Sequence, residues 1–323
     1  MPASVVLGGA KLQAVATERG QVTEIPRPPL GNGLQVIGLL ERAQGLVTVV
    51  RGPLPQDPGA VYVLGDTDHQ PRSLGTGVAV VAGATDHELW IADRVAEDGL
   101  TTARRADIGQ EVPALVQRVP RGRSLVGFGA GGLVLSVAPD PDGEIIGPVD
   151  VMDPAKGTLV RRLADSGSVI ATDGQRAVVL VDGACTRSCT LRVAGPAGDR
   201  SVNLPAGLVP ETGGATTAAA TVFIGRSNGG PRHVWVLTLT DGTARDTGLT
   251  LPPESGPSPM AMDAQGAWAF TRSGPSTLVA VRTAEAKAEA LPFPLEPWNA
   301  IAVTAGGTCA CNGGGGGSGP PSV

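Results

Sequence analysis

The stretch that decides the fold is residues 169–205, VIATDGQRAVVLVDGACTRSCTLRVAGPAGDRSVNLP. It contains a Val/Ile run, an Asp-Gly turn, a second apolar run, a segment bracketed by two cysteines, a third run and a polar strand that closes on Pro. Short β-branched runs separated by turn residues are typical of consecutive antiparallel strands. The stretch therefore predicts four strands that follow one another along the chain.

The same order of short apolar runs, turns and a polar strand recurs on both sides of this stretch. Further copies lie at residues 45–75, 78–109 and 261–294. A period of roughly 40 to 45 residues made of strands alone is the signature of a β-propeller, whose four-stranded blades pack around an axis. We therefore predict an all-β chain that forms a single β-propeller.

The number of blades follows from the outermost strands, which should be polar or alternating because one of their faces meets water. Seven such segments are predicted, at residues 21–25, 70–74, 101–108, 157–163, 200–204, 243–249 and 286–291. Seven blades are the main prediction. The third blade has the weakest pattern, so a ring of six blades is the alternative.

The ends of the chain supply the means of closing the ring. The first blade begins with SVVLGG and has no preceding inner strand, while NAIAVTA at residues 299–305 follows the last outer strand. Pairing these two segments would close the ring and remove exposed sheet edges. We predict a propeller over residues 1–306 and a disordered Gly-rich tail over residues 307–323, because NGGGGGSGPPSV buries nothing.

Composition narrows the class of partner. The net charge is −5, there is no Lys/Arg run, and the aromatic residues are four Trp, four Phe and one Tyr. A phosphate backbone needs a concentrated basic face and single strands need stacking platforms, so nucleic acid is not expected. No run of 18 apolar residues occurs, so no membrane span is predicted in this chain. We expect a monomer.

The four cysteines form two close pairs. Cys185 and Cys189 bracket a predicted hairpin loop, where their Cα atoms can approach to disulfide distance. A disulfide is preferred and indicates an extracytoplasmic protein, secreted or anchored through a segment upstream of residue 1; two reduced thiols in the cytosol are the alternative. Cys309 and Cys311 would close a small strained ring, so labile, intermolecular and reduced states remain open.

Several segments have the sequence of propeller repeats: the turns Asp173-Gly174 and Asp263-Ala-Gln-Gly266, the strands LWIADR and VDVMDPAKGTLVRRL, and the Cys-bracketed hairpin. Together they resemble bacterial extracytoplasmic β-propellers of the PQQ-like and WD40-like repeat superfamilies. The tryptophan-docking motif of quinone-dependent dehydrogenases and the Gly-His and Trp-Asp pairs of WD40 blades are absent. The resemblance thus implies an architecture and carries over no cofactor.

Four motifs imitate catalytic or ligand-binding sites. Residues 164–168 (ADSGS) resemble a serine-protease nucleophile segment but fall at a predicted turn between blades. Residues 127–132 (GFGAGG) imitate a dinucleotide loop without the helix it needs. The Thr-Asp-His triplets at 67–69 and 85–87 are predicted to lie on opposite faces, and residues 140–144 (DPDGE) read as a β-turn rather than a calcium loop. We predict no catalytic residue, no metal and no cofactor.

Loops on a rigid scaffold commonly carry function. The longer second-to-third-strand and between-blade loops share one face of the ring, and we predict them at residues 53–59, 138–147, 226–232 and 292–298. Partner-binding residues on this face are predicted to be Arg226, Arg232, Trp298, Asp140 and Asp142, because Arg and aromatic contacts dominate interfaces.

The functional hypothesis is a non-catalytic extracytoplasmic propeller, a binding or scaffold module that engages a protein, envelope component or small ligand through this loop-bearing face. An enzyme is the alternative: a hydrolase or lyase with acidic residues at the channel mouth, or a cofactor-dependent oxidoreductase. Clustered carboxylates with perturbed pKa values would favour that alternative. A structural module of a longer membrane-anchored protein is the third hypothesis.

Overall fold

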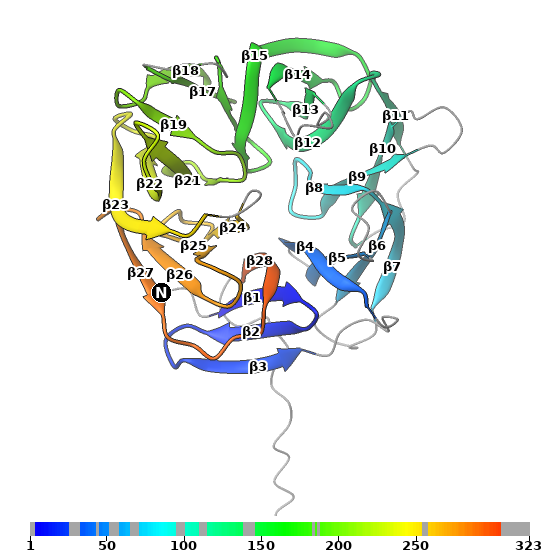
Figure 1. The fold of residues 1–323 in the computed structure, drawn as a ribbon. Coiled ribbons are helices and arrows are strands. Elements are labelled where there is room, and N and C mark those ends of the chain that lie inside the picture. The colour runs from blue at the N-terminus through cyan, green and yellow to red at the C-terminus, as the bar shows by residue number, and fades with distance from the viewer. Residues whose placement is uncertain are drawn as a thin grey trace, which may run out of the picture.

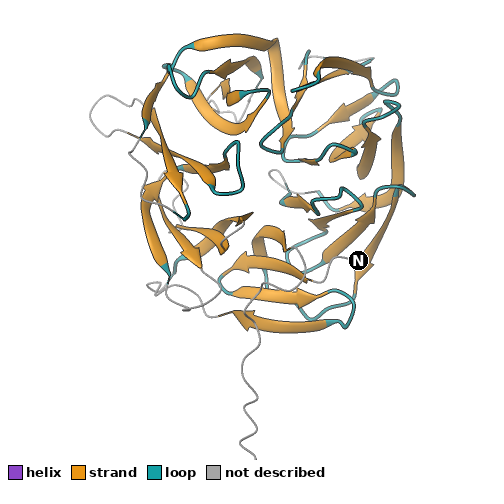
Figure 2. Cartoon of the chain, turned by 180° about the vertical axis from the view of Figure 1, so that it is seen from behind, coloured by secondary structure: helices purple, strands orange, loops and turns teal. Residues whose placement is uncertain are grey.

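The strands form a ring of antiparallel sheets in the computed structural model of the 323-residue chain (Figure 1). The structure describes residues 4–25, 33–42, 45–51, 58–64, 71–94, 101–109, 115–137, 146–182, 185, 188–253 and 258–304. These residues contain strands, turns and loops and no helix, as the view from behind also shows (Figure 2). The prediction of an all-β chain is confirmed.

The strands group into sheets of four, which we number as blades in chain order. Blade one contains β28 (Trp298–Thr304), β1 (Ser4–Gly9), β2 (Leu12–Ala16) and β3 (Gln21–Ile25). Blade two contains β4 (Gln35–Arg42), β5 (Gly45–Arg51), β6 (Gly59–Leu64) and β7 (Arg72–Gly77). Blade three contains β8 (Ala79–Ala82), β9 (Glu88–Arg94), β10 (Thr101–Asp107) and β11 (Val116–Val119).

Blades four and five share one strand. Blade four contains β12 (Arg123–Gly129), β13 (Gly132–Val137), β14 (Gly147–Met152) and the first half of β15 (Leu159–Thr172). Blade five contains the second half of β15, β16 (Ala177–Leu180), β17 (Thr190–Gly195) and β18 (Gly198–Asn203).

The last two blades lead back to the start of the ring. Blade six contains β21 (Ala220–Ser227), β22 (Arg232–Thr238), β23 (Ala244–Leu251) and an inner edge in two pieces, β19 (Leu208–Pro210) and β20 (Ala215–Thr216). Blade seven contains β24 (Met260–Met262), β25 (Trp268–Arg272), β26 (Leu278–Arg282) and β27 (Lys287–Leu291). This grouping is consistent with the predicted seven blades.

The predicted closure of the ring is confirmed. Strand β28 pairs antiparallel with β1, so that Val303 lies opposite Val5 and Ala300 lies opposite Gly8. One blade therefore contains strands from both ends of the described chain, and unfolding either end exposes the edge of the other.

The core is divided among the gaps between neighbouring blades. Within the described residues, seven apolar clusters lie between consecutive sheets, one for each neighbouring pair. The cluster between blades seven and one, for example, joins Phe270 and Leu278 to Val5 and Trp298. The strands are mostly aliphatic because each middle strand is buried on both faces between two sheets.

Strand β15 corrects the expectation of a turn at residues 164–168. The strand continues without a turn from the outer edge of blade four, where Ala164 lies opposite Val149, to the inner edge of blade five, where Ser168 lies opposite Leu180. Gly167 stands at the crossing, where a Cβ atom would collide with the Leu180 carbonyl oxygen. The Asp-Ser-Gly sequence is therefore part of a strand.

Blade three corrects two further strand assignments. Residues 101–108 were predicted to form its outermost strand, but β10 is the third strand, and β11 pairs with it on the outside. Thr85, Asp86 and His87 lie in the turn between the first and second strands, β8 and β9, rather than between the second and third. The companion triplet at 67–69 lies outside the described residues.

The predicted disulfide is confirmed. Cys185 and Cys189 are bonded, with their Cα atoms 5.1 Å apart, in the connection between β16 and β17. Both are buried in the cluster between blades five and six, beside Leu204, Leu208 and Phe223. The disulfide thus braces a loop on the face that also carries the connection between β21 and β22.

Candidate functional site

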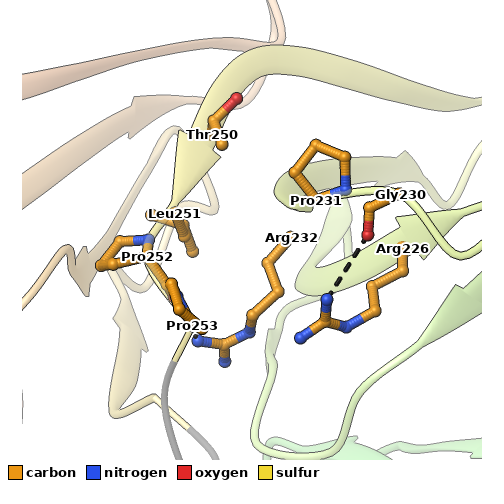
Figure 3. Close-up of a pocket in the computed structure, with 8 residues that line it drawn as sticks. All are labelled: Arg226, Gly230, Pro231, Arg232, Thr250, Leu251, Pro252 and Pro253. Carbon is orange, nitrogen blue, oxygen red and sulfur yellow. Dashed lines mark hydrogen bonds between the residues drawn. The ribbon is translucent and has the colours of Figure 1, made fainter.

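The candidate site lies on blade six, where the connection between β21 and β22 meets the chain that leaves β23. A cavity of about 530 Å³ opens there, within the size range of small-molecule sites. Figure 3 shows its lining, which consists of Arg226, Gly230, Pro231, Arg232, Thr250, Leu251, Pro252 and Pro253. Two of the five predicted partner-binding residues, Arg226 and Arg232, therefore lie together.

Local sequence explains the shape of the β21–β22 connection. Arg226 and Arg232 are the last facing pair of the hairpin. Asn228 and Gly229 follow with φ angles of 52° and 70°, values that Asn and Gly adopt most easily. The backbone N–H of Asn228 donates to the Gly207 carbonyl at 2.8 Å, and this hydrogen bond links the turn to the start of blade six.

Arg232 is a buried structural cation. Its side chain is 2% exposed. The guanidinium donates three hydrogen bonds to the Glu211 carboxylate: from Nε to Oε1 at 3.0 Å, from Nε to Oε2 at 2.9 Å and from Nη2 to Oε2 at 2.7 Å. It also donates to the Pro252 carbonyl at 3.1 Å and to the Ser258 hydroxyl at 3.4 Å. A partner cannot reach a side chain buried to this extent, so the direct contact predicted for Arg232 is corrected to a supporting one.

Arg226 is the accessible cation of the pair. Its side chain is 42% exposed, its Nε lies 3.3 Å from Glu211 Oε1, and its Nη1 donates to the Gly230 carbonyl at 3.4 Å. These contacts are longer than those that Arg232 makes with Glu211 and are typical of weakly held surface ion pairs. Arg226 can therefore exchange them for contacts with a bound group.

Trp298 is also placed differently from the prediction. Its side chain is 0% exposed in the cluster between blades seven and one, and the Arg272 guanidinium lies 6.0 Å from its ring centroid. An interface anchor needs an exposed ring, so the role predicted for Trp298 does not fit its burial. Asp140 and Asp142 lie outside the described residues, as do residues 53–57 and 138–145 of two predicted loops.

Sequence reasoning missed Glu211 and a polar relay on the outer strands. His233 Nδ1 lies 2.7 Å from Asp246 Oδ2, and His233 Nε2 lies 3.1 Å from the Thr250 hydroxyl. His233 and Thr250 face each other across β22 and β23, a pairing that the register of the hairpin could have suggested. In Figure 3 the Thr250 hydroxyl points away from the two arginines.

The carboxyl groups with shifted pKa values are found in turns. Backbone N–H donors of Ala155 and Lys156 lower the pKa of Asp153, and the Thr243 N–H does the same for Asp241. The two groups belong to the turns before β15 and β23, in blades four and six. These shifts reflect turn geometry and form no pair of acids of the kind that the enzyme alternative needs.

Arg42 lies at the turn between β4 and β5, on the face opposite the candidate site. Burial lowers the pKa of Arg42, against the opposing charges of Asp86 and Glu88 in and beside the β8–β9 turn. Throughout the part of the chain that the structure describes, no group of three or more His, Cys, Asp or Glu side chains could hold a metal ion. The same residues contain no helix long and apolar enough to cross a membrane.

Solved structures place this architecture among known folds. The chain is similar to apo AztD from Citrobacter koseri, with a TM-score of 0.56 and 15% identity over 92% of this chain and 83% of that one. It is similar to TolB from Acinetobacter baumannii, with a TM-score of 0.53 and 13% identity over 93% and 65%. The chain is a β-propeller.

The propeller also resembles part of an enzyme. A structure from a study of two prolyl endopeptidases matches with a TM-score of 0.61 and 13% identity over 90% of this chain, which spans about half, 48%, of that one. No family model matches the chain, and no curated protein matches it. Identities this low show the fold alone, so function must be argued from the site.

Proposed function

We propose that this propeller is a non-catalytic, extracytoplasmic binding module that engages a protein, an envelope component or a small ligand through its loop-bearing face. The observation that carries the proposal is the blade-six cavity, in which a half-exposed Arg226 stands beside rigid proline walls. Arg is enriched among the residues that dominate binding energy. Proline walls lose little freedom when a ligand binds, which lowers the entropic cost of association.

The buried disulfide supports the proposed location. Structural disulfides persist in oxidising compartments and are rare in the cytosol. Cys185 and Cys189 lie in the loop next to blade six, so the bond also stiffens the face that we propose for binding. We also include Asp140 and Asp142 in the proposed surface, because in the sequence they fall between β13 and β14, the position that corresponds to the β21–β22 connection of blade six.

Site-specific photo-crosslinking tests the proposal. A photoreactive amino acid at Pro253, an exposed residue of the cavity lining, should yield a discrete adduct from an envelope extract of the source organism. Excess unlabelled propeller should suppress this adduct. The control position is Lys287, which is exposed and begins β27 beyond the turn from β26, on the opposite face. Equal labelling from both positions, or none from Pro253, would reject the assigned face.

A further inference from the structure

The charges around Glu211 do not balance. Among the described residues, Glu211 is the carboxylate that both cavity arginines contact. Arg232 engages both of its oxygens at 2.7 to 3.0 Å, a geometry typical of strong two-pronged arginine–carboxylate pairs. Arg226 reaches one oxygen at 3.3 Å. Within the described residues, these three side chains carry two positive charges and one negative charge, and Arg226 is the arginine that Glu211 holds less closely.

The excess charge faces the cavity. Arg232 is buried and held by Glu211, Pro252 and Ser258, whereas Arg226 is half-exposed and lines the cavity. The two guanidinium groups lie at one end of the drawn residues in Figure 3, with Pro231 and Thr250 toward the other end. An anion at this end would meet the flat donor fork of Arg226, which matches a carboxylate in shape.

The rest of the lining offers few competing donors. Pro231, Pro252 and Pro253 have no backbone N–H, and the Pro252 carbonyl already accepts from Arg232. The three prolines are exposed and supply apolar contact surface beside Arg226, the accessible cation of the described lining. A ligand that fits both features has an anionic head and an apolar body.

We infer that the cavity binds a carboxylate attached to an apolar body, either at the end or on an acidic side chain of a peptide or in a small organic acid. This inference rests on the proposed binding function and names its ligand class. The carboxylate replaces the long contacts of Arg226 with Gly230 and Glu211, while the Glu211–Arg232 pair stays in place as the support.

The test uses matched compounds because the natural ligand is not identified. Carboxylic acids and their primary amides, sharing the same aliphatic or aromatic bodies, are screened by ligand-observed NMR and titrated against the intact chain. Peptides with a free carboxyl terminus, and amidated peptides with an internal Glu, form two further arms. We expect the acids to bind in preference to their amides, and the arm with the tightest binding identifies the source.

The variants separate ligand recognition from folding. Arg226→Gln should weaken acid binding roughly 10- to 100-fold, as expected for loss of a charged hydrogen bond, and leave amide binding unchanged. Arg282→Gln is the matched control, because Arg282 is 37% exposed and paired with Glu285 at 3.1 Å on blade seven. Pro253→Trp should block both compound classes by filling the cavity.

The outcomes distinguish the two proposals. Equal binding of acids and amides, no binding of either class, or acid binding that Arg226→Gln leaves unchanged would overturn the ligand class. If a crosslink from Pro253 is still found in that case, the binding face stands and only its chemistry is wrong. If the crosslink also fails, the proposed function falls with it.

Discussion

Replacing Glu211 by Ala should destabilise the propeller strongly, although Glu211 lies at the surface of blade six. The Arg232 side chain is 2% exposed and makes three contacts with Glu211 at 2.7 to 3.0 Å. Without the carboxylate, the guanidinium keeps the Pro252 carbonyl and the Ser258 hydroxyl as partners. A buried cation would then lack a countercharge.

The expected magnitude follows from the burial of the two partners. Removing one member of a buried ion pair costs about 3 to 5 kcal/mol. Glu211 is 26% exposed, so water can enter the gap, and the cost should lie at the lower end, about 3 kcal/mol. The unfolding entropy of a domain of about 300 residues is roughly 0.6 kcal/mol per kelvin, so Tm should fall by about 5 °C.

Urea unfolding followed by tryptophan fluorescence, together with calorimetry, measures this cost. Glu285→Ala is the control, because Glu285 and Arg282 form an exposed pair worth about 1 kcal/mol or less. Adding Arg232→Met to Glu211→Ala should restore most of the stability, since an apolar side chain leaves no buried charge. A loss no larger than that of Glu285→Ala, or no recovery in the double variant, would refute the reasoning.

Three further predictions concern the core, the disulfide and acid stability. Trp298→Ala should cost about 3 to 5 kcal/mol of unfolding free energy because the ring is fully buried, yet the folded fraction should bind ligands as before; a selective loss of binding would restore Trp298 to the interface. Replacing Cys185 and Cys189 by Ala should cost about 2 kcal/mol, the value for so short a loop, and urea unfolding under reducing conditions should abolish the difference from the native protein. Backbone N–H donors lower the pKa of Asp153 in the folded state from its ordinary value of 3.8. The stability that this carboxylate contributes is therefore present above pH 3.8 and is lost as the pH falls through the lower pKa of the folded state. Asp153→Asn should be less stable than the native protein at neutral pH and equally stable in acid, and a difference in stability that stays constant with pH would contradict this.

Much of the fold could be predicted because its determinants are local. Each blade repeats strands in which apolar and polar residues alternate, turns with Gly and Asp, and a polar outer strand. Each strand pairs mainly with the next one along the chain. The closure by residues 299–305 was also predictable, because an inner strand was missing at one end and an extra strand was present at the other. The pairing of Cys185 with Cys189 followed from four residues of separation across one hairpin.

Prediction failed where a residue's role depends on another segment that packs against it only in the folded chain. Residues 164–168 have turn composition, yet they continue one strand from blade four into blade five, where the Leu180 carbonyl leaves room only for glycine at position 167. Arg232 and Arg226 look alike in the sequence. Glu211, which directly follows β19, holds Arg232 as a buried support and contacts the more exposed Arg226 at a longer distance. Tryptophan is a residue type that often anchors interfaces, but Trp298 is buried between blades seven and one, where the Arg272 guanidinium lies over its ring.

Strand periodicity and turn chemistry act over a few residues, so a ring of short antiparallel strands with a disulfide-linked hairpin could be predicted from the sequence. The exposure of Arg226 and the position of the cavity are visible only in the folded chain. Those properties are set by side chains from separate segments of blade six, such as Glu211, Arg226 and Pro253, because burial and charge compensation arise only when those segments pack together.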